Sequence, residues 1–194
     1  MNMLHQITLL LILPLLLLDQ GAAKSDNPTT YEDQEAYEVY AAILQSDWLL
    51  RHAHAKTLII QTETKSFQMC LQPDEEWKEK VGPAISDYVR LNAKPWLLQR
   101  RINIEVPYQL IKVDVLMSLV KNAGWEAFHQ QYEHSKGWME LSAVGFNNDK
   151  TVAVVYMGHH CGNLCGDGRF YVLEKKAGQW LPLDWKGTSC AWAS

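Results

Sequence analysis

The feature of this sequence that most constrains its fold is a change in hydrophobic period at Gly137. After this residue, apolar and polar side chains alternate with a period of two, which is typical of β-strands whose two faces differ. Four segments follow this pattern, and short connections that contain Asn, Asp or Gly separate most of them. They predict an antiparallel meander with strands at residues 138–146, 151–157, 170–175 and 179–185.

Two of these segments have a defined place in the predicted sheet. Residues 152–156 (VAVVY) are apolar on both faces, so we expect a central strand that is covered from both sides. Pro182 lacks a backbone N–H and cannot donate to a neighbouring strand. The segment 179–185 is therefore expected at an edge of the sheet.

The part of the chain before Gly137 shows mainly helical spacing. Apolar residues recur every three or four positions in 37–44, 77–88 and 113–120, whereas residues 56–64 and 102–112 are expected to be extended. Gly82-Pro83 lies inside the second helical segment and is expected to kink or split it. Helices followed by hairpins predict an α+β fold, with N-terminal helices packed on a C-terminal antiparallel β-meander of about four to five strands.

The first residues have the features of an export signal. Residues 7–18 form an apolar run that is too short to span a bilayer, and Gly21 and Ala23 fit a cleavage site after Ala23. An uncleaved N-terminal anchor is the alternative, because no Lys or Arg precedes the run. The mature protein is expected to be secreted or periplasmic, without a transmembrane span. The predicted organisation is a signal peptide at 1–23, a polar lead at 24–30 and a single globular domain at 31–194.

The charge balance excludes one class of partner. The 194 residues carry a formal net charge of −4, and no run of Lys or Arg exceeds two residues. Nucleic-acid binding requires a basic stripe or face. We therefore expect no nucleic-acid partner.

Export also determines how the four cysteines are interpreted. In an oxidising compartment an even number of cysteines favours disulfides over free thiols. Four cysteines allow three pairings, and the sequence alone does not choose between them. We favour Cys161–Cys165 together with Cys70–Cys190, because the glycines around the near pair let the backbone turn sharply.

The segment from 158 to 168 is the densest group of residues that could carry chemistry. His159, His160, Cys161 and Cys165 stand close together, beside glycines at positions 162, 166 and 168. Imidazole and thiolate ligands suit Zn²⁺ or Cu(I), so a metal site is one interpretation. Export favours a second interpretation, a structural disulfide that closes a hairpin loop. A labile redox pair is the third.

Three motifs stand out in this half of the chain: SAVGFNNDKTVAVVY, the loop CGNLCGDG and the closing FYVLEKKAGQW. Together they resemble a family of uncharacterised secreted bacterial proteins with an S-x-V-G-F-N strand, a C-G-x-L-C-G-x-G loop and a closing L-E-K-x-x-G-x-W hairpin. The upstream GWEAFHQQY and VPYQLI are similar to weaker blocks of that family, so the resemblance covers residues 31–185. It implies a compact exported domain and carries over no catalytic residue.

The sequence has no familiar catalytic signature. A G-x-S-x-G elbow, an H-E-x-x-H helix and a phosphate-binding glycine loop are all missing. The chain has eight tryptophans instead. We expect five or six of them in the core, which leaves Trp96, Trp185 and Trp192 as the candidates for exposure and partner binding. Exposed indole rings are a common means of binding sugars, peptides or lipids.

These observations lead to two hypotheses of different classes. The first is an exported, non-enzymatic domain without a cofactor, which binds an unidentified cell-envelope or extracellular partner through the disulfide-closed hairpin loop and the three tryptophans. The alternative is a metal-binding or metal-delivery protein that holds Zn or Cu with His159, His160, Cys161 and Cys165. An enzyme whose site is assembled from distant residues is a third possibility that motifs do not test.

Overall fold

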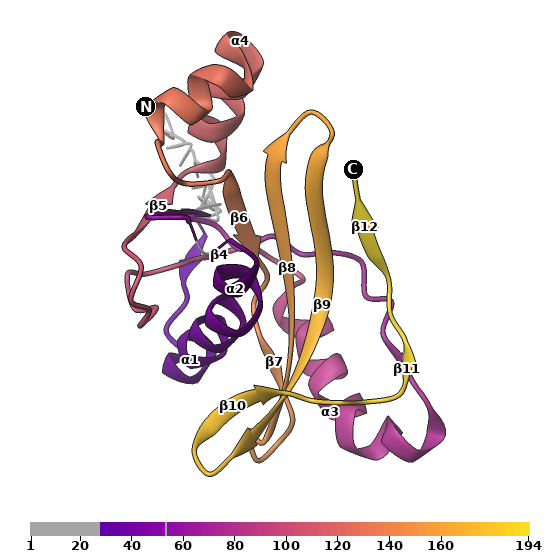
Figure 1. Ribbon diagram of the computed structural model, residues 1–194. Coiled ribbons are helices and arrows are strands. Elements are labelled where there is room, and N and C mark those ends of the chain that lie inside the picture. Colours follow the sequence, from indigo (N-terminus) through magenta and orange to yellow (C-terminus); the bar gives the residue numbers. More distant parts are fainter. Residues whose placement is uncertain (1–27, 53) are drawn as a thin grey trace, which may run out of the picture.

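The chain folds around a mixed β-sheet that helices cover on both sides (Figure 1). The computed structural model describes residues 28–52 and 54–194, so the expected signal peptide at 1–23 and most of the polar lead at 24–30 lie outside the described residues. The helical elements are α1 (Gln34–Ile43), the π-helical turn η1 (Leu44–Trp48), α2 (Leu49–Arg51), α3 (Glu75–Leu91) and α4 (Val113–Gln131).

Within the described residues, eight strands belong to the main sheet and four short strands form two separate pairs. The main sheet contains β2 (Leu58–Gln61), β5 (Tyr108–Ile111), β6 (Trp138–Leu141), β7 (Gly145–Phe146), β8 (Val152–Gly162), β9 (Cys165–Lys176), β10 (Gln179–Pro182) and β12 (Ala191–Ala193). The separate pairs are β1 (Thr29–Thr30) with β4 (Trp96–Leu97), and β3 (Gln72–Pro73) with β11 (Gly187–Thr188).

The strand order of the main sheet is β10-β9-β8-β6-β2-β5, with β12 paired to β9 and β7 paired to β8. The pairs on the β10 side, as far as β6, are antiparallel. In contrast, β2 runs parallel to both of its neighbours, β6 and β5. The sheet therefore has an antiparallel half from the C-terminal part of the chain and a parallel half that recruits earlier strands.

The predicted α+β class is confirmed, but the simple antiparallel meander is wrong. β8, β9 and β10 do form consecutive hairpins, and β10 with Pro182 lies at an edge as expected. Not all helices are N-terminal, however, because α3 and α4 alternate with strands. Strands that run parallel need a crossover connection, and α3 and α4 lie in the connections that bring β5 and β6 beside β2.

The two faces of the main sheet have separate cores. On one face, which we call the α1 face, α1 and η1 pack Tyr40 and Trp48 against β2, β6 and β8. On the other, the α4 face, α3 packs against β8 and β9, and α4 packs Phe128 against Trp138. β8 is buried continuously from Val152 to His159, which confirms the expected central strand.

The expected split of the second helix at Gly82-Pro83 does not occur. α3 continues through both residues. A proline removes the hydrogen bond to the carbonyl four residues earlier, which here belongs to Glu79. Glu79 and Pro83 are exposed, so water can replace the missing donor, whereas Val81 is on the buried side of the helix.

Both of the favoured disulfides are present in the structure. Cys70 and Cys190 are joined across 120 residues with their Cα atoms 5.9 Å apart. This bond fastens the C-terminal segment to the chain just before α3, next to the β3–β11 pair. Cys161 and Cys165 are joined across the end of the β8–β9 hairpin, with a Cα–Cα distance of 5.1 Å.

The two disulfides should differ in their contribution to stability. By chain entropy, a bond that closes a long loop constrains the unfolded chain more, by about 5 kcal/mol for Cys70–Cys190 against about 2 kcal/mol for Cys161–Cys165. We expect the double variant Cys70→Ser/Cys190→Ser to lose more free energy of unfolding than Cys161→Ser/Cys165→Ser. Denaturant unfolding of both variants measures the difference. Equal losses would contradict the chain-entropy explanation.

Candidate functional site

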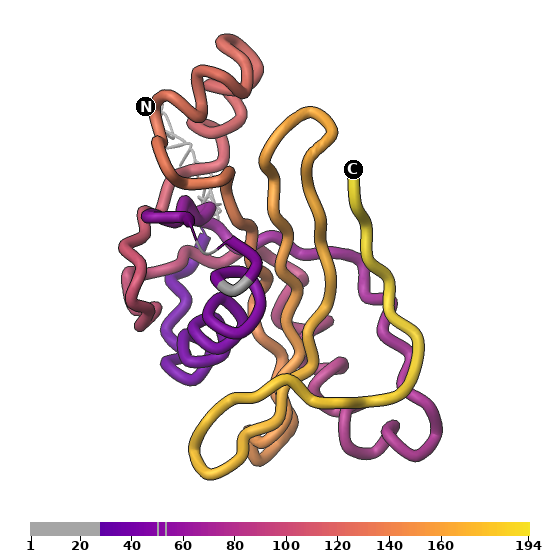
Figure 2. The backbone as a smooth tube through the Cα atoms, viewed as in Figure 1, coloured from indigo at the N-terminus to yellow at the C-terminus, as the bar shows by residue number. Residues whose placement is uncertain are grey.

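The candidate site lies at the end of the β8–β9 hairpin, whose strands are longer than expected. Their pairing continues to Gly162 and Cys165, so only Asn163 and Leu164 form the turn. The expected loop at 158–168 is therefore mostly strand. The hairpin tip, defined here as residues 162–165, and α4 lie at the same end of the molecule, opposite β10 (Figures 1 and 2).

Gly166 and Gly168 have a different role from the one expected. Both lie within β9, and neither has a positive φ angle, so they do not turn the chain. Trp192 of β12 pairs with Gly168, and its ring lies over both glycines. A Cβ atom at Gly166 would approach the ring to 3.0 Å, and a Cβ atom at Gly168 would overlap the indole nitrogen. The missing side chains make room for Trp192, whose Nε1–H donates to Tyr156 Oη at 2.7 Å.

Adding a methyl group at Gly168 should displace Trp192. We expect Gly168→Ala to lower the free energy of unfolding by about 1–3 kcal/mol, as overpacking does, and to shift the indole N–H signal of Trp192 in NMR spectra. The control is Gly82→Ala in α3, where no atom lies within 4 Å of the added Cβ apart from the adjoining residues and the helix's own backbone. That variant should leave the Trp192 signal unchanged. An unchanged Trp192 signal in Gly168→Ala would contradict this explanation of the glycine.

Four rings form a continuous row across the α4 face. Trp125 of α4 stacks on Trp138 of β6, with centroids 4.8 Å apart and 9° between the planes. Trp138 stacks on His160 at 5.2 Å, and His160 lies 5.4 Å from Trp192. Because an indole lies on each side of the imidazole, the packing holds His160 in one orientation.

Glu140 is a buried carboxylate next to this row, with 8% of its surface exposed. Its Oε1 accepts a hydrogen bond from Tyr156 Oη at 3.4 Å, and its Oε2 lies 3.3 Å from His160 Nε2. Gly158 on the adjacent strand leaves space for it, since a Cβ there would be 2.7 Å from Oε1. Burial, with the charge of Glu140 beside it, raises the pKa of Tyr156 well above its usual value, so the hydroxyl keeps its proton and donates.

A pocket of 420 Å³ opens above Glu140, between α4 and the sheet. The floor of the pocket is polar and comes from three strands, with Gln61, Glu140 and His160. A contact between His129 Nε2 and the Cys161 carbonyl oxygen, at 3.1 Å, fixes α4 to the hairpin. The pocket therefore combines a buried charge with an apolar wall. The wall comes from α4 (Val113, Met117, Val120 and Trp125), and the remaining lining residues are Lys65, Trp138, Gly162 and Asn163.

His159 points to the opposite side of the sheet from His160. It is 4% exposed, packs against Trp48 and His52, and its Nε2–H donates to the Lys136 carbonyl oxygen at 2.7 Å. Burial lowers its pKa more than the nearby Asp167, 3.7 Å from Nδ1, raises it. His159 is therefore neutral at neutral pH, and its contact with Asp167 is not an ion pair.

The four residues of the metal hypothesis are not brought together. Cys161 and Cys165 are joined in the disulfide, and His159 and His160 lie on opposite faces because they are consecutive residues of one strand. Among residues 28–52 and 54–194, no group of three or more His, Cys, Asp or Glu side chains is arranged to hold a metal ion. Metal binding here is a hypothesis that would first require reduction of the disulfide.

His159 should make stability depend on pH. Its pKa in the folded protein is lower than the value of about 6.5 in the unfolded chain. Its contribution is therefore complete above about pH 6.5 and is lost as the pH falls, by at most about 1.4 kcal/mol per pH unit. We expect His159→Gln to flatten the decline in the free energy of unfolding between about pH 6.5 and 5, whereas the exposed control His54→Gln should keep it. Equal slopes in both variants would contradict this assignment.

Only one of the three tryptophans that were candidates for exposure lies at the site. Trp192 is in the ring row, whereas Trp185 packs beside the α3 core and Trp96 is half-buried, with its Nε1–H donating to the Leu91 carbonyl oxygen at 2.8 Å. All three are half-buried, so each presents only part of its ring to solvent. Their part in binding a partner stays a prediction.

Sequence reasoning missed Glu140 and Trp125. Glu140 follows Trp138 by two positions in a strand, so both side chains lie on the same face. A carboxylate on the same strand face as a large apolar ring is the sequence signal that could have identified Glu140 as a site residue. Trp125 carried no comparable signal, because its contact with Trp138 depends on how α4 packs.

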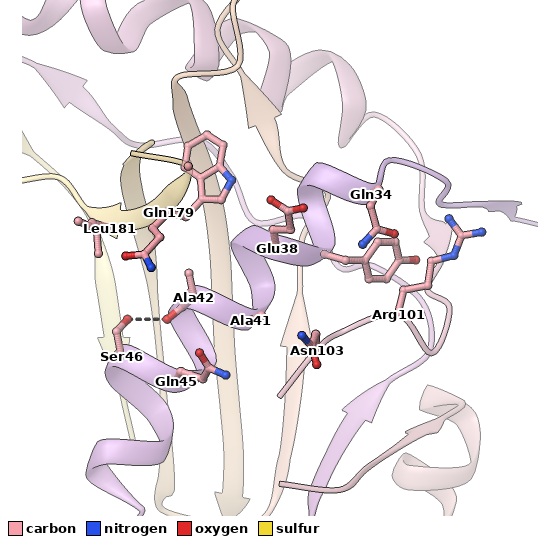
Figure 3. Close-up of a pocket in the computed structure, with 13 residues that line it drawn as sticks. Gln34, Glu38, Ala41, Ala42, Gln45, Ser46, Arg101, Asn103, Gln179 and Leu181 are labelled. Carbon is pink, nitrogen blue, oxygen red and sulfur yellow. Dashed lines mark hydrogen bonds between the residues drawn. The ribbon is translucent and has the colours of Figure 1, made fainter. Parts of the chain in front are cut away.

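A second concavity, of 530 Å³, lies between α1 and β10 (Figure 3). Its polar side chains, among them Gln45 and Gln179, are exposed, and the rings of Tyr37 and Trp180 that line it are buried in the core. It thus offers neither a buried charge nor an open ring face. The pocket above Glu140 is the better candidate site.

Comparison with known proteins identifies no relative, so the function of this chain is interpreted from the geometry of the site. No protein-family model, curated protein or solved structure matches this chain. None of the helices in the described part of the chain combines the length and hydrophobicity of a bilayer-spanning segment.

Proposed function

We propose that this chain is an exported, non-enzymatic binding domain that contacts a cell-envelope or extracellular partner through the hairpin tip and the pocket beside it. One observation carries the proposal: Leu164, at the turn of the disulfide-closed hairpin, is 87% exposed. The two disulfides also favour an oxidising compartment, outside the cytosol. Membership of the exported family that the sequence resembles is part of the same proposal.

The surroundings of Leu164 support an interaction surface. Met117 on α4 is also exposed, and it lines the same pocket as Asn163 of the tip. Exposed large apolar side chains beside a pocket are typical of binding sites. The disulfide holds the tip in one conformation, so little conformational entropy is lost when a partner binds.

The proposal predicts where small molecules bind. We expect a fragment screen, read by ¹⁵N–¹H NMR of the mature protein, to shift the signals of Leu164 and the indole of Trp125. Trp125→Ala should weaken these fragments by about tenfold or more, because it removes a wall of the pocket.

Two matched variants serve as controls. Trp77→Ala removes a half-buried indole from α3, and Leu181→Ser replaces an exposed leucine on β10, at the opposite end of the sheet. Neither should change fragment binding, whereas Leu164→Ser should weaken fragments that reach the tip. Fragments that gather in the concavity between α1 and β10 instead would overturn the proposed site.

A further inference from the structure

We infer that the pocket beside the hairpin tip binds a ligand that carries a protonated primary amine next to an apolar group. This inference rests on the proposed binding function and specifies the chemistry of the ligand. Its basis is the carboxylate of Glu140 on the pocket floor, which is buried yet lines the cavity.

The hydrogen bonds of Glu140 are incomplete. A carboxylate has about four acceptor positions, and the protein supplies one hydrogen bond, from Tyr156 Oη to Oε1, while His160 Nε2 lies 3.3 Å from Oε2. The other acceptor positions are available to a donor that enters the pocket. An ammonium group fits best, because it brings several N–H donors together with the opposite charge.

The rest of the pocket determines what is attached to the amine. Val113, Met117 and Val120 on α4 present an apolar wall opposite the floor, so the group beside the ammonium is apolar. Lys65 also lines the pocket, but its side chain is exposed, whereas Glu140 is buried. Because water screens an exposed charge, Lys65 opposes a bound ammonium less than Glu140 attracts it.

Three probes of the same length separate charge from hydrophobicity. Hexylamine, 1-hexanol and hexanoate are titrated into the mature protein with both disulfides intact, and the indole N–H signals of Trp125 and Trp138 report binding. We expect hexylamine to bind about tenfold or more tightly than hexanol, as a charge-assisted hydrogen bond implies, and hexanoate to bind most weakly. Equal affinity for hexanol, or tighter binding of hexanoate, would overturn the inference but leave the proposed binding function standing.

Variants test whether Glu140 is responsible. Glu140→Gln keeps the size of the side chain and removes the charge, so hexylamine should lose its advantage over hexanol. The matched control Glu174→Gln changes a carboxylate at the other end of β9, where it pairs with Lys80 and Lys176, and should keep that advantage. If Glu140→Gln does not fold, Met117→Lys adds a positive charge at an exposed wall position and should abolish hexylamine binding.

The source of the amine is distinguished by two further probes, the lysine side chain of N-acetyl-lysine-N-methylamide and the amino terminus of leucinamide. Binding of either one at the Trp125 and Trp138 signals supports the inference and identifies that group as the one recognised. Binding of hexylamine alone supports a small amphiphilic amine. Failure of every amine, while neutral fragments still occupy the pocket, overturns the inference and not the proposed function.

Discussion

The central strand β8 must be covered on both sides, and the rest of the structure follows from this constraint. β8 is buried from Val152 to His159, so neither of its faces can meet water. α1 and η1 cover one face as a single layer, but the other is shared between α3 and α4, whose cores are separate clusters. The site forms where these two clusters meet: Glu140 contacts Tyr156 of the α3 cluster and His160, which stacks on Trp138 of the α4 cluster.

Strand alternation divides the chemistry of the hairpin end into two environments. His159 faces Trp48 and is neutral and buried, so it contributes to stability in a pH-dependent way. His160, its neighbour in sequence, faces the pocket and Glu140. Two histidines that look like one ligand pair in the sequence therefore have unrelated surroundings. The disulfide between Cys161 and Cys165 lies just beyond them and closes the hairpin.

Local patterns predicted what depends on local structure. The period of two located β8, β9 and β10, the apolar run 152–156 identified the central strand, and Pro182 identified the edge. The parallel pairing of β2 with β5 and β6 was not predictable in this way, because it depends on contacts between segments distant in sequence. For the site, the sequence pointed to His160 and Trp192. Gly166 and Gly168 were expected to turn the chain, but they make room for a neighbouring ring. The sequence does not show which residue packs against a glycine, so this role was not predictable.

The presence of Glu140 is difficult to explain by stability alone. Burying a carboxylate costs several kcal/mol, and hydrogen bonds offset this only when they satisfy its acceptors. Tyr156 satisfies part of that requirement, His160 Nε2 lies 3.3 Å from the other oxygen, and Glu140 itself lines a cavity. An apolar side chain at this position would join the α3 and α4 cores and exclude water from the gap between them. A charge kept there, with an apolar wall opposite and a disulfide-fixed turn beside it, is better explained by a ligand that completes its hydrogen bonds than by the folding of the domain.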